Sequence, residues 1–278
     1  MSSIITNNSA MNALNIMKSV NKNLNDTQER ISTGMAVRSS KDNAAYFSIS
    51  ETMKGDSGML KSIDEGLTLT RNVVSTGRLG AETFADLTKQ VSERVAFAQG
   101  EGVDLDKVQD EITALTDRMK TVLDQSTFNG ASMVDGDGSS TDDISVVTGV
   151  ARDSSGTFST TAITIKKVNL NDILDAVKAI DLTSSTDLAA DLVTLEDNLS
   201  LANDAATSLG ISEKSIETQQ EFLNDLTTRL DSGVGSIVDA DMEEEAARLQ
   251  ALQTQQQLAM QSLSIANQGP SQLMQLFR

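Results

Sequence analysis

The sequence contains no cysteine and no histidine among its 278 residues. Thiol nucleophiles, Cys/His zinc sites and Ser-His-Asp triads are therefore excluded. Tryptophan is also absent, tyrosine and proline occur once each, and aromatic residues make up 3% of the chain. A core centred on aromatic side chains is not expected from this composition. These absences predict a protein that is not an enzyme and that carries no cofactor.

Basic residues are too few to balance the acidic ones, and the formal net charge is -18. Nucleic acid and anionic membranes would repel such a chain over a Debye length of about 8 to 10 Å. The N-terminus lacks the basic segment and continuous apolar run of a cleavable secretory signal. We therefore expect no nucleic acid partner and no membrane insertion, and either retention inside the cell or export by a non-Sec route.

The hydrophobic residues, 38% of the chain, recur mainly at helical spacing. A first amphipathic helix is predicted from Ile4 to Ile31, with Gly34 as its stop. Asp42 is the predicted N-cap of a second helix, which reaches about Gly100 and is interrupted by several glycines. The seam of the first helix consists of Ala10, Leu14, Met17, Asn21, Leu24, Gln28 and Ile31.

The same periodicity predicts four more helices. Asp104 can cap a third helix that returns antiparallel to the second and extends to Gln125. A short helix over 170–180 precedes a long one over 187–230, whose end is marked by Gly233 and Gly235. The last helix starts near Asp239 or Asp241, and its acidic first turn complements the helix dipole.

A different pattern occupies the middle of the chain. Two short alternating runs, 144–146 and 162–165, lie among Gly, Ser, Asp and Thr and predict a β-hairpin, the only strand signal in the sequence. The expected fold class is therefore mainly α: a long antiparallel helical bundle or coiled coil with a small β-hairpin, in which the two terminal helices pair.

The two ends of the chain are almost free of charge. No charged residue occurs from Leu249 to Phe277, although glutamines are frequent there, and no acidic residue precedes Asp26. A membrane helix would not carry so many amides, and a solvated helix would carry Lys and Glu. These properties favour burial against other protein, with disordered tails as the alternative interpretation.

Burial of the ends in a polymer would cause little repulsion between like charges. The residues 1–33 and 249–278 together carry a net charge of +2, so the acidic charge lies in the middle of the chain, where it can stay in water. The residues expected to form the polymerisation interface are Leu14, Met17, Leu24, Ile31, Met242, Leu249, Leu252, Ala259, Leu263 and Ala266.

Short motifs at both ends resemble those of a known family. They are Arg30-Ile31-Ser32-Thr33-Gly34, Lys41-Asp42-Asn43-Ala44-Ala45 with Ile49, Phe128-Asn129-Gly130, Asp239-Ala240-Asp241-Met242 and Leu263-Ser264-Ile265-Ala266-Asn267-Gln268. In this order they resemble bacterial flagellin over roughly residues 1–134 and 186–278. The stretch 131–182 leaves room only for a hairpin and a short helix, so the chain looks like a short form without large outer domains.

The resemblance implies a structural subunit that polymerises into the flagellar filament for motility. Residues 1–40 and 236–278 would form an inner layer of terminal helices, and 41–235 a long-helix bundle with the hairpin at about 131–168. It also implies an extracellular location in the flagellum, reached through type III export without a cleavable signal peptide. The implied partners are other copies of the chain, the export apparatus and a chaperone, and hook-associated and cap proteins.

Two other functions fit parts of the pattern. A hook-filament junction protein would share the terminal helices, and the formation of long polymers by purified monomer would distinguish it. A soluble helical signalling or chaperone-like bundle would stay in the cytoplasm, and the charge-free final helix argues against it.

One departure from the family pattern concerns an animal receptor. Many flagellins carry an Arg, a Leu four residues later and a Gln three after that, which contact the Toll-like receptor that senses flagellin. This chain resembles them around the segment 91–93 but has Gln90, Arg94 and Phe97 at those positions. Weak or no receptor activation is therefore expected.

An acidic loop invites comparison with a calcium site. Asp135, Asp137, Asp142 and Asp143 lie close in sequence. The loop misses the EF-hand pattern, because Ser140 and Val146 stand where that pattern requires Gly and Glu. A solvated turn is expected here, and no metal site.

Overall fold

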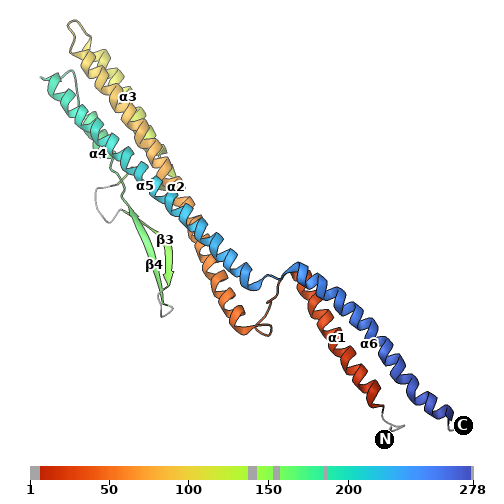
Figure 1. Ribbon diagram of the computed structural model, residues 1–278. Helices are drawn as coiled ribbons and strands as arrows, with labels where there is room; N and C mark the ends of the chain where they lie inside the picture. The colour runs from red at the N-terminus through yellow and green to blue at the C-terminus, as the bar shows by residue number, and fades with distance from the viewer. Residues whose placement is uncertain (1–6, 137–142, 153–156, 185–186, 277–278) are drawn as a thin grey trace. The chain divides into compact units, whose positions relative to one another are not determined.

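A computed structural model of the chain describes residues 7–136, 143–152, 157–184 and 187–276 (Figure 1). The elements are α1 (Asn8–Thr33), α2 (Ala44–Ala98), α3 (Leu105–Gln125), β1 (Thr127–Phe128), β2 (Ala131–Ser132), β3 (Ile144–Arg152), β4 (Phe158–Ile165), α4 (Asn171–Lys178), α5 (Leu188–Val238) and α6 (Met242–Leu276). Two compact units can be distinguished, 1–56 with 229–278, and 57–228. The mainly helical fold with a small hairpin is confirmed.

Local capping chemistry sets most helix ends. Gly34 ends α1 in the left-handed conformation, with φ 71° and its N–H donating to the Arg30 carbonyl. The Asp104 side chain caps α3 by accepting from the backbone N–H of Lys107. At α2 the prediction was one residue off, because Asn43, not Asp42, accepts from the first backbone N–H groups of the helix.

Two helices continue through glycines that were expected to interrupt or end them. The α2 helix is unbroken, and α5 passes Gly233 and Gly235 to end at Val238, so the predicted end near Leu230 was wrong. A Cβ on Gly233 would lie 2.7 Å from the Met53 Cε. The Met53 methyl is the flexible end of its side chain, so Gly233 packs beside it within α5 and does not act as a helix stop.

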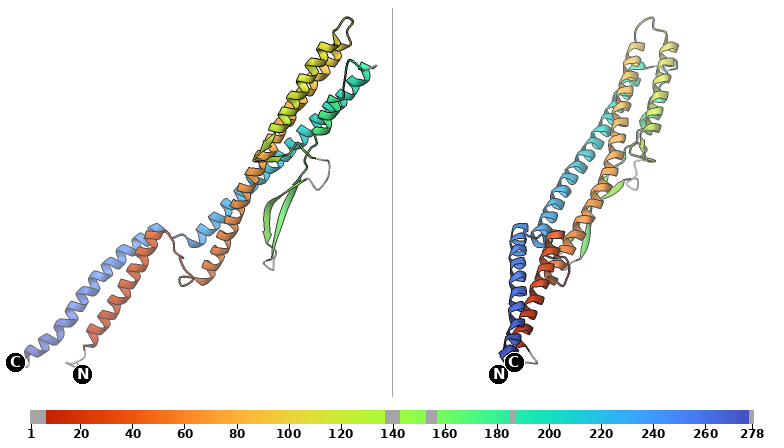
Figure 2. Two further views of the ribbon diagram at one scale, coloured as in Figure 1. Left: turned by 180° about the vertical axis from the view of Figure 1, so that it is seen from behind. Right: turned by 90° about the vertical axis from the view of Figure 1, so that its right-hand side faces the viewer.

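The unit 57–228 is a helical bundle in which α2, α3 and α5 lie side by side (Figures 1 and 2). Its fully buried side chains include Leu67, Phe84, Ile112, Leu195, Leu209 and Ile216. Arg78 of α2 forms a salt bridge of 2.7 Å with Glu213 of α5. The Gln109 side chain of α3 bonds to the backbone of Ile180 and Leu182, which fastens the segment after α4 to the bundle.

The predicted hairpin is present as β3 and β4. They pair antiparallel with Ile144 opposite Ile165, and Gln219 of α5 donates to the Thr148 carbonyl at 2.8 Å. A second, very short hairpin of β1 and β2 turns at Asn129 and Gly130, which both have positive φ. The expectation of a single strand signal was therefore wrong, because the Asn129-Gly130 dipeptide also favours a tight hairpin turn.

The unit made of 1–56 and 229–278 contains α1, α6 and the two connecting segments beside them. The connectors pair through backbone hydrogen bonds, from the Ala36 N–H to the Val238 carbonyl and from the Ala240 N–H to the Gly34 carbonyl. Val37 and Val238 are buried at this junction. Within the described ranges, none of the helices combines the length and apolarity that a bilayer crossing requires.

The paired terminal helices as candidate functional site

The helices α1 and α6 run antiparallel, side by side along their length (Figure 2). Three polar contacts join them at successive levels: Asn7 Nδ2 to the Ala266 carbonyl at 2.7 Å, Gln256 Nε2 to Asn21 Oδ1 at 2.7 Å, and Arg30 NH1 to Glu245 Oε1 at 3.2 Å. The predicted pairing of the chain ends is thus confirmed.

A narrow apolar seam lies between the polar contacts. Val20, Leu24 and Leu252 form a buried cluster, against which the partly buried Leu249 packs. The residues of the seam that the prediction missed are Ala13, Val20 and Thr27, which are all buried. Their seven-residue spacing was the available signal, but small and polar side chains made it weaker than the neighbouring stripe of larger residues.

The residues predicted for the interface differ in how far one subunit buries them. Leu24, Leu252 and Ala259 are buried, and Met17, Ile31, Leu249, Leu263 and Ala266 are partly buried. Leu14 and Met242 are exposed, at 38% and 46% of their surface. The helix pair of one subunit therefore buries only part of its own apolar surface.

An open groove runs between the two helices toward the chain ends. It encloses about 780 Å³ and is lined by α1 and α6, including Ala13, Val20 and Ala259 at its floor. Ile16, Leu258 and Ile265 also line it and expose 59%, 57% and 66% of their surface. Such an uncharged concave strip can bury another apolar helix or side chains, but it has no arrangement for acid-base or nucleophilic chemistry.

Charged groups gather at the opposite end of the pair, near the connectors. Glu245 is 5% exposed and accepts from Arg30 and Arg248. Glu29 forms a salt bridge with Arg38, and this hydrogen bond lowers the pKa of Glu29. The backbone N–H of Arg38, followed by that of Ser39, lowers the pKa of Asp42. Several motif residues therefore have a local structural role.

The acidic loop lies only partly within the described residues. Asp135 contacts Lys167 at 3.4 Å, while Asp137 and Asp142 lie outside the described residues. In the part of the chain that the structure describes, no three carboxylates come together as a metal site would require.

Comparison with known proteins identifies the chain. The family model of the bacterial flagellin N-terminal helical region matches residues 4–139, and that of the C-terminal helical region matches 192–277. The chain belongs to the bacterial flagellin family. A flagellin of Brucella melitensis is 36% identical over 285 residues, and the flagellin FljM of Caulobacter vibrioides 31% over 281, with 99% or more of each chain covered.

Other relatives of this flagellin are longer. Flagellin A of Rhizobium meliloti is 30% identical over an alignment of 396 residues that covers both chains completely, so it carries insertions where this flagellin is short. The shorter length of this chain supports the expectation that it is a flagellin without large outer domains. A solved structure named for a flagellar hook-associated protein from Vibrio parahaemolyticus has a TM-score of 0.53 at 11% identity, covering 71% of this flagellin and 99% of that chain, which indicates a similar fold only.

Flagellins are structural proteins, and this flagellin is a subunit that polymerises into the bacterial flagellar filament. The relatives named flagellins span the whole chain, so neither a hook-filament junction protein nor a soluble signalling bundle is favoured.

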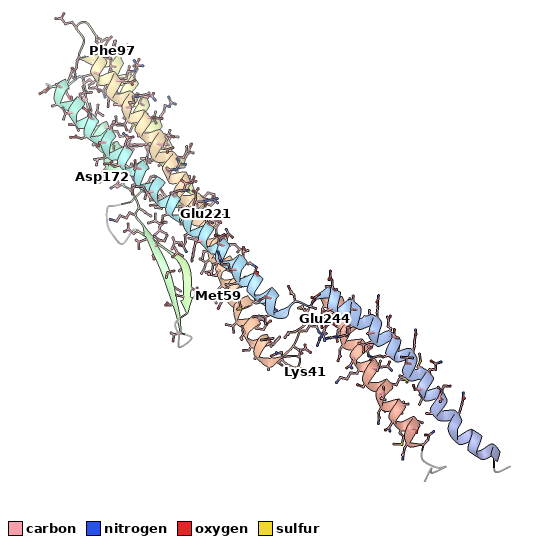
Figure 3. The ribbon with its side chains drawn as sticks, viewed as in Figure 1. Lys41, Met59, Phe97, Asp172, Glu221 and Glu244 are labelled. Atoms are coloured by element: carbon pink, nitrogen blue, oxygen red, sulfur yellow. The ribbon has the colours of Figure 1, made fainter. Side chains whose placement is uncertain are left out.

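The three predicted receptor positions of this flagellin lie on α2. Gln90, Arg94 and Phe97 are all exposed, and Arg94 forms a salt bridge of 3.2 Å with Glu111 of α3. Phe97 lies near the end of α2 (Figure 3), and 59% of its surface is exposed. The altered side chains are therefore accessible on a single subunit.

Proposed function

We propose that the terminal helix pair is the surface through which subunits of this flagellin join. The groove between α1 and α6 is the observation that supports this most directly, because it leaves large apolar side chains exposed on an uncharged strip. Its occupant is the same strip of a second copy. The ten interface residues predicted from the sequence belong to this surface, partly as the seam of the pair and partly as its exposed flank.

Charge supports a second copy as the occupant. Beyond Arg248, α6 carries no charged residue among those the structure describes, and glutamine amides alternate with its apolar side chains. Two such surfaces can approach without desolvating charges, and their amides can hydrogen-bond across the contact. An acidic or basic partner would gain no complementary charge on this strip.

The proposal includes a layered filament. Residues 1–40 and 236–278 form its inner layer, and the acidic bundle of 41–235 forms the next layer, where its charge remains in water. Family membership supports export through the flagellar apparatus with a chaperone, hook-associated and cap proteins as further partners, and a role without catalysis.

Electron microscopy of purified protein tests the proposal. Adding salt to the subunits, with and without short filament seeds, is expected to favour long filaments because it screens the acidic bundle. Leu258→Asp places a charge in the groove and should abolish assembly. As a control, Asn203→Asp adds the same charge at an exposed position of α5, and this variant should assemble normally. Subunits that stay monomeric under all conditions, or filaments of Leu258→Asp, would contradict the proposal.

A further inference from the structure

Glu245 is an acidic residue of α6 that lies at the end of the α1–α6 pair nearest the connectors. Its Oε1 accepts from Arg30 NH1 of α1 and from Arg248 NH1 of its own helix, each at 3.2 Å. Its Oε2 is buried without a hydrogen-bond partner within the described residues. Burying a carboxylate in this way costs more than an apolar residue would, so a role other than stability has to account for it.

The apolar seam around Glu245 specifies the alignment of the two helices only weakly. Buried residues recur every seven positions, with Ala13, Val20 and Thr27 on α1 and with Glu245, Leu252 and Ala259 on α6. If one helix slid by seven residues, small side chains would replace one another along most of the seam. Heptad packing of this kind tolerates such shifts unless a polar residue opposes them.

The polar contacts do oppose such a shift. A slide by one heptad would place Glu245 opposite the level of Asn23 or Val37 instead of Arg30, and it would separate Gln256 from Asn21. The buried carboxylate would then lose the guanidinium of the other helix. Only Arg248 of its own helix would then remain as a partner of the carboxylate, so the shifted alignments are disfavoured.

We propose that Glu245, acting through Arg30, is a positioning residue for the axial register of α1 against α6, together with the Asn21–Gln256 contact and the backbone pairing of Gly34 with Ala240. The register determines which residues of both helices line the groove. In its consequence for assembly the inference rests on the proposed function, because a shifted pair would present a different groove to the neighbouring copy.

The absence of cysteine permits a direct measurement of register by disulfide formation in the full-length protein. The spacing of the polar contacts along the two antiparallel helices places Asn12 near the level of Ser262. Both residues line the groove. Asn12→Cys with Ser262→Cys therefore reports the native register. Asn12→Cys with Gln255→Cys reports α6 displaced by one heptad in the direction that brings Glu245 to the level of Asn23. The measured quantity is the ratio of the two cross-linking yields.

Adjacent glutamates provide a matched pair of variants. Glu245→Gln removes the buried charge, whereas Glu244→Gln removes an exposed charge that also contacts Arg248 (Figure 3). We expect Glu245→Gln to raise the displaced-to-native ratio by about tenfold, and Glu244→Gln to leave it unchanged. Arg30→Glu and Glu245→Arg should each raise the ratio, and their combination should restore it.

The possible outcomes separate the two proposals. A ratio that is unaffected by Glu245→Gln, or singles that the double variant does not restore, would overturn the register inference, even if filaments form normally. A ratio that depends on Glu245 in protein that never assembles would support the inference and contradict the proposed function.

Discussion

Gly80 of α2 lies directly against Ser126, the residue that follows α3. A Cβ on Gly80 would come within 2.0 Å of the Ser126 Oγ and 2.7 Å of its Cβ. Ser126 is itself buried and cannot move into solvent without disturbing the end of α3. Gly80 is therefore required by a close approach between two helices and not by the conformation of its own backbone.

Gly80→Ala should destabilise the bundle despite the better helix propensity of alanine. Overpacking costs about 1 to 3 kcal/mol, against a gain of about 1 kcal/mol for removing a helical glycine. The matched control is Gly66→Ala, since a Cβ there would meet nothing within 4 Å. Urea unfolding followed by circular dichroism should show a lower midpoint for Gly80→Ala and a slightly higher one for Gly66→Ala. Equal midpoints would contradict the close packing.

The connector between α1 and α2 should weaken in acid. Hydrogen bonds from Arg38 lower the pKa of Asp42 and of Glu29 in the folded protein. A carboxylate with a lowered folded pKa stabilises the protein above its unfolded pKa of about 4, and this contribution disappears as the pH falls through the folded pKa.

Asp42→Ala should therefore lower the urea midpoint at about pH 7, and the difference from the unmodified protein should shrink as the pH falls through the folded pKa of Asp42. Ser40→Ala, at an exposed position of the same connector, introduces no titrating change. Any difference that it causes should be independent of pH. A deficit of Asp42→Ala that persists undiminished in strong acid would rule out the charge as its source.

Leu252→Asp should prevent filament formation. Leu252 is 7% exposed in the seam of α1 and α6. A carboxylate there would be buried without a partner, which costs about 3 kcal/mol or more. Leu263→Asp, at a partly buried position of the same helix, should also reduce filament formation. The long helices of the bundle should remain, as judged by circular dichroism. Leu252→Met conserves the volume and should assemble; normal filaments of Leu252→Asp would contradict the interface.

The receptor prediction can be tested in both directions. The unmodified protein should give a weak or absent response in cells that report activation of the flagellin-sensing Toll-like receptor. Gln90→Arg, Arg94→Leu and Phe97→Gln together should raise the response by about tenfold or more, because exposed side chains at a contact surface can each contribute over 1 kcal/mol. A strong response from the unmodified protein would contradict the prediction.

Short-range chemistry made much of this fold predictable. The Asp104 carboxylate caps α3 and Gly34 ends α1, because each interaction involves residues only a few positions apart. The alternating runs of β3 and β4 pair as expected. For the candidate site, the α6 seam through Leu249, Leu252 and Ala259 follows the predicted period, since large residues dominate that face of the helix.

The sequence by itself thus determined the helices, the main hairpin, several helix ends and the pairing of the uncharged termini. Only the tertiary structure decided which stripe of α1 faces α6, and that Gly80 of α2 lies against Ser126. Both depend on residues brought close from distant parts of the chain. Local propensity cannot show that a glycine makes room for a neighbour, or that Ala13 and Val20 pack inward while the larger Leu14 remains exposed.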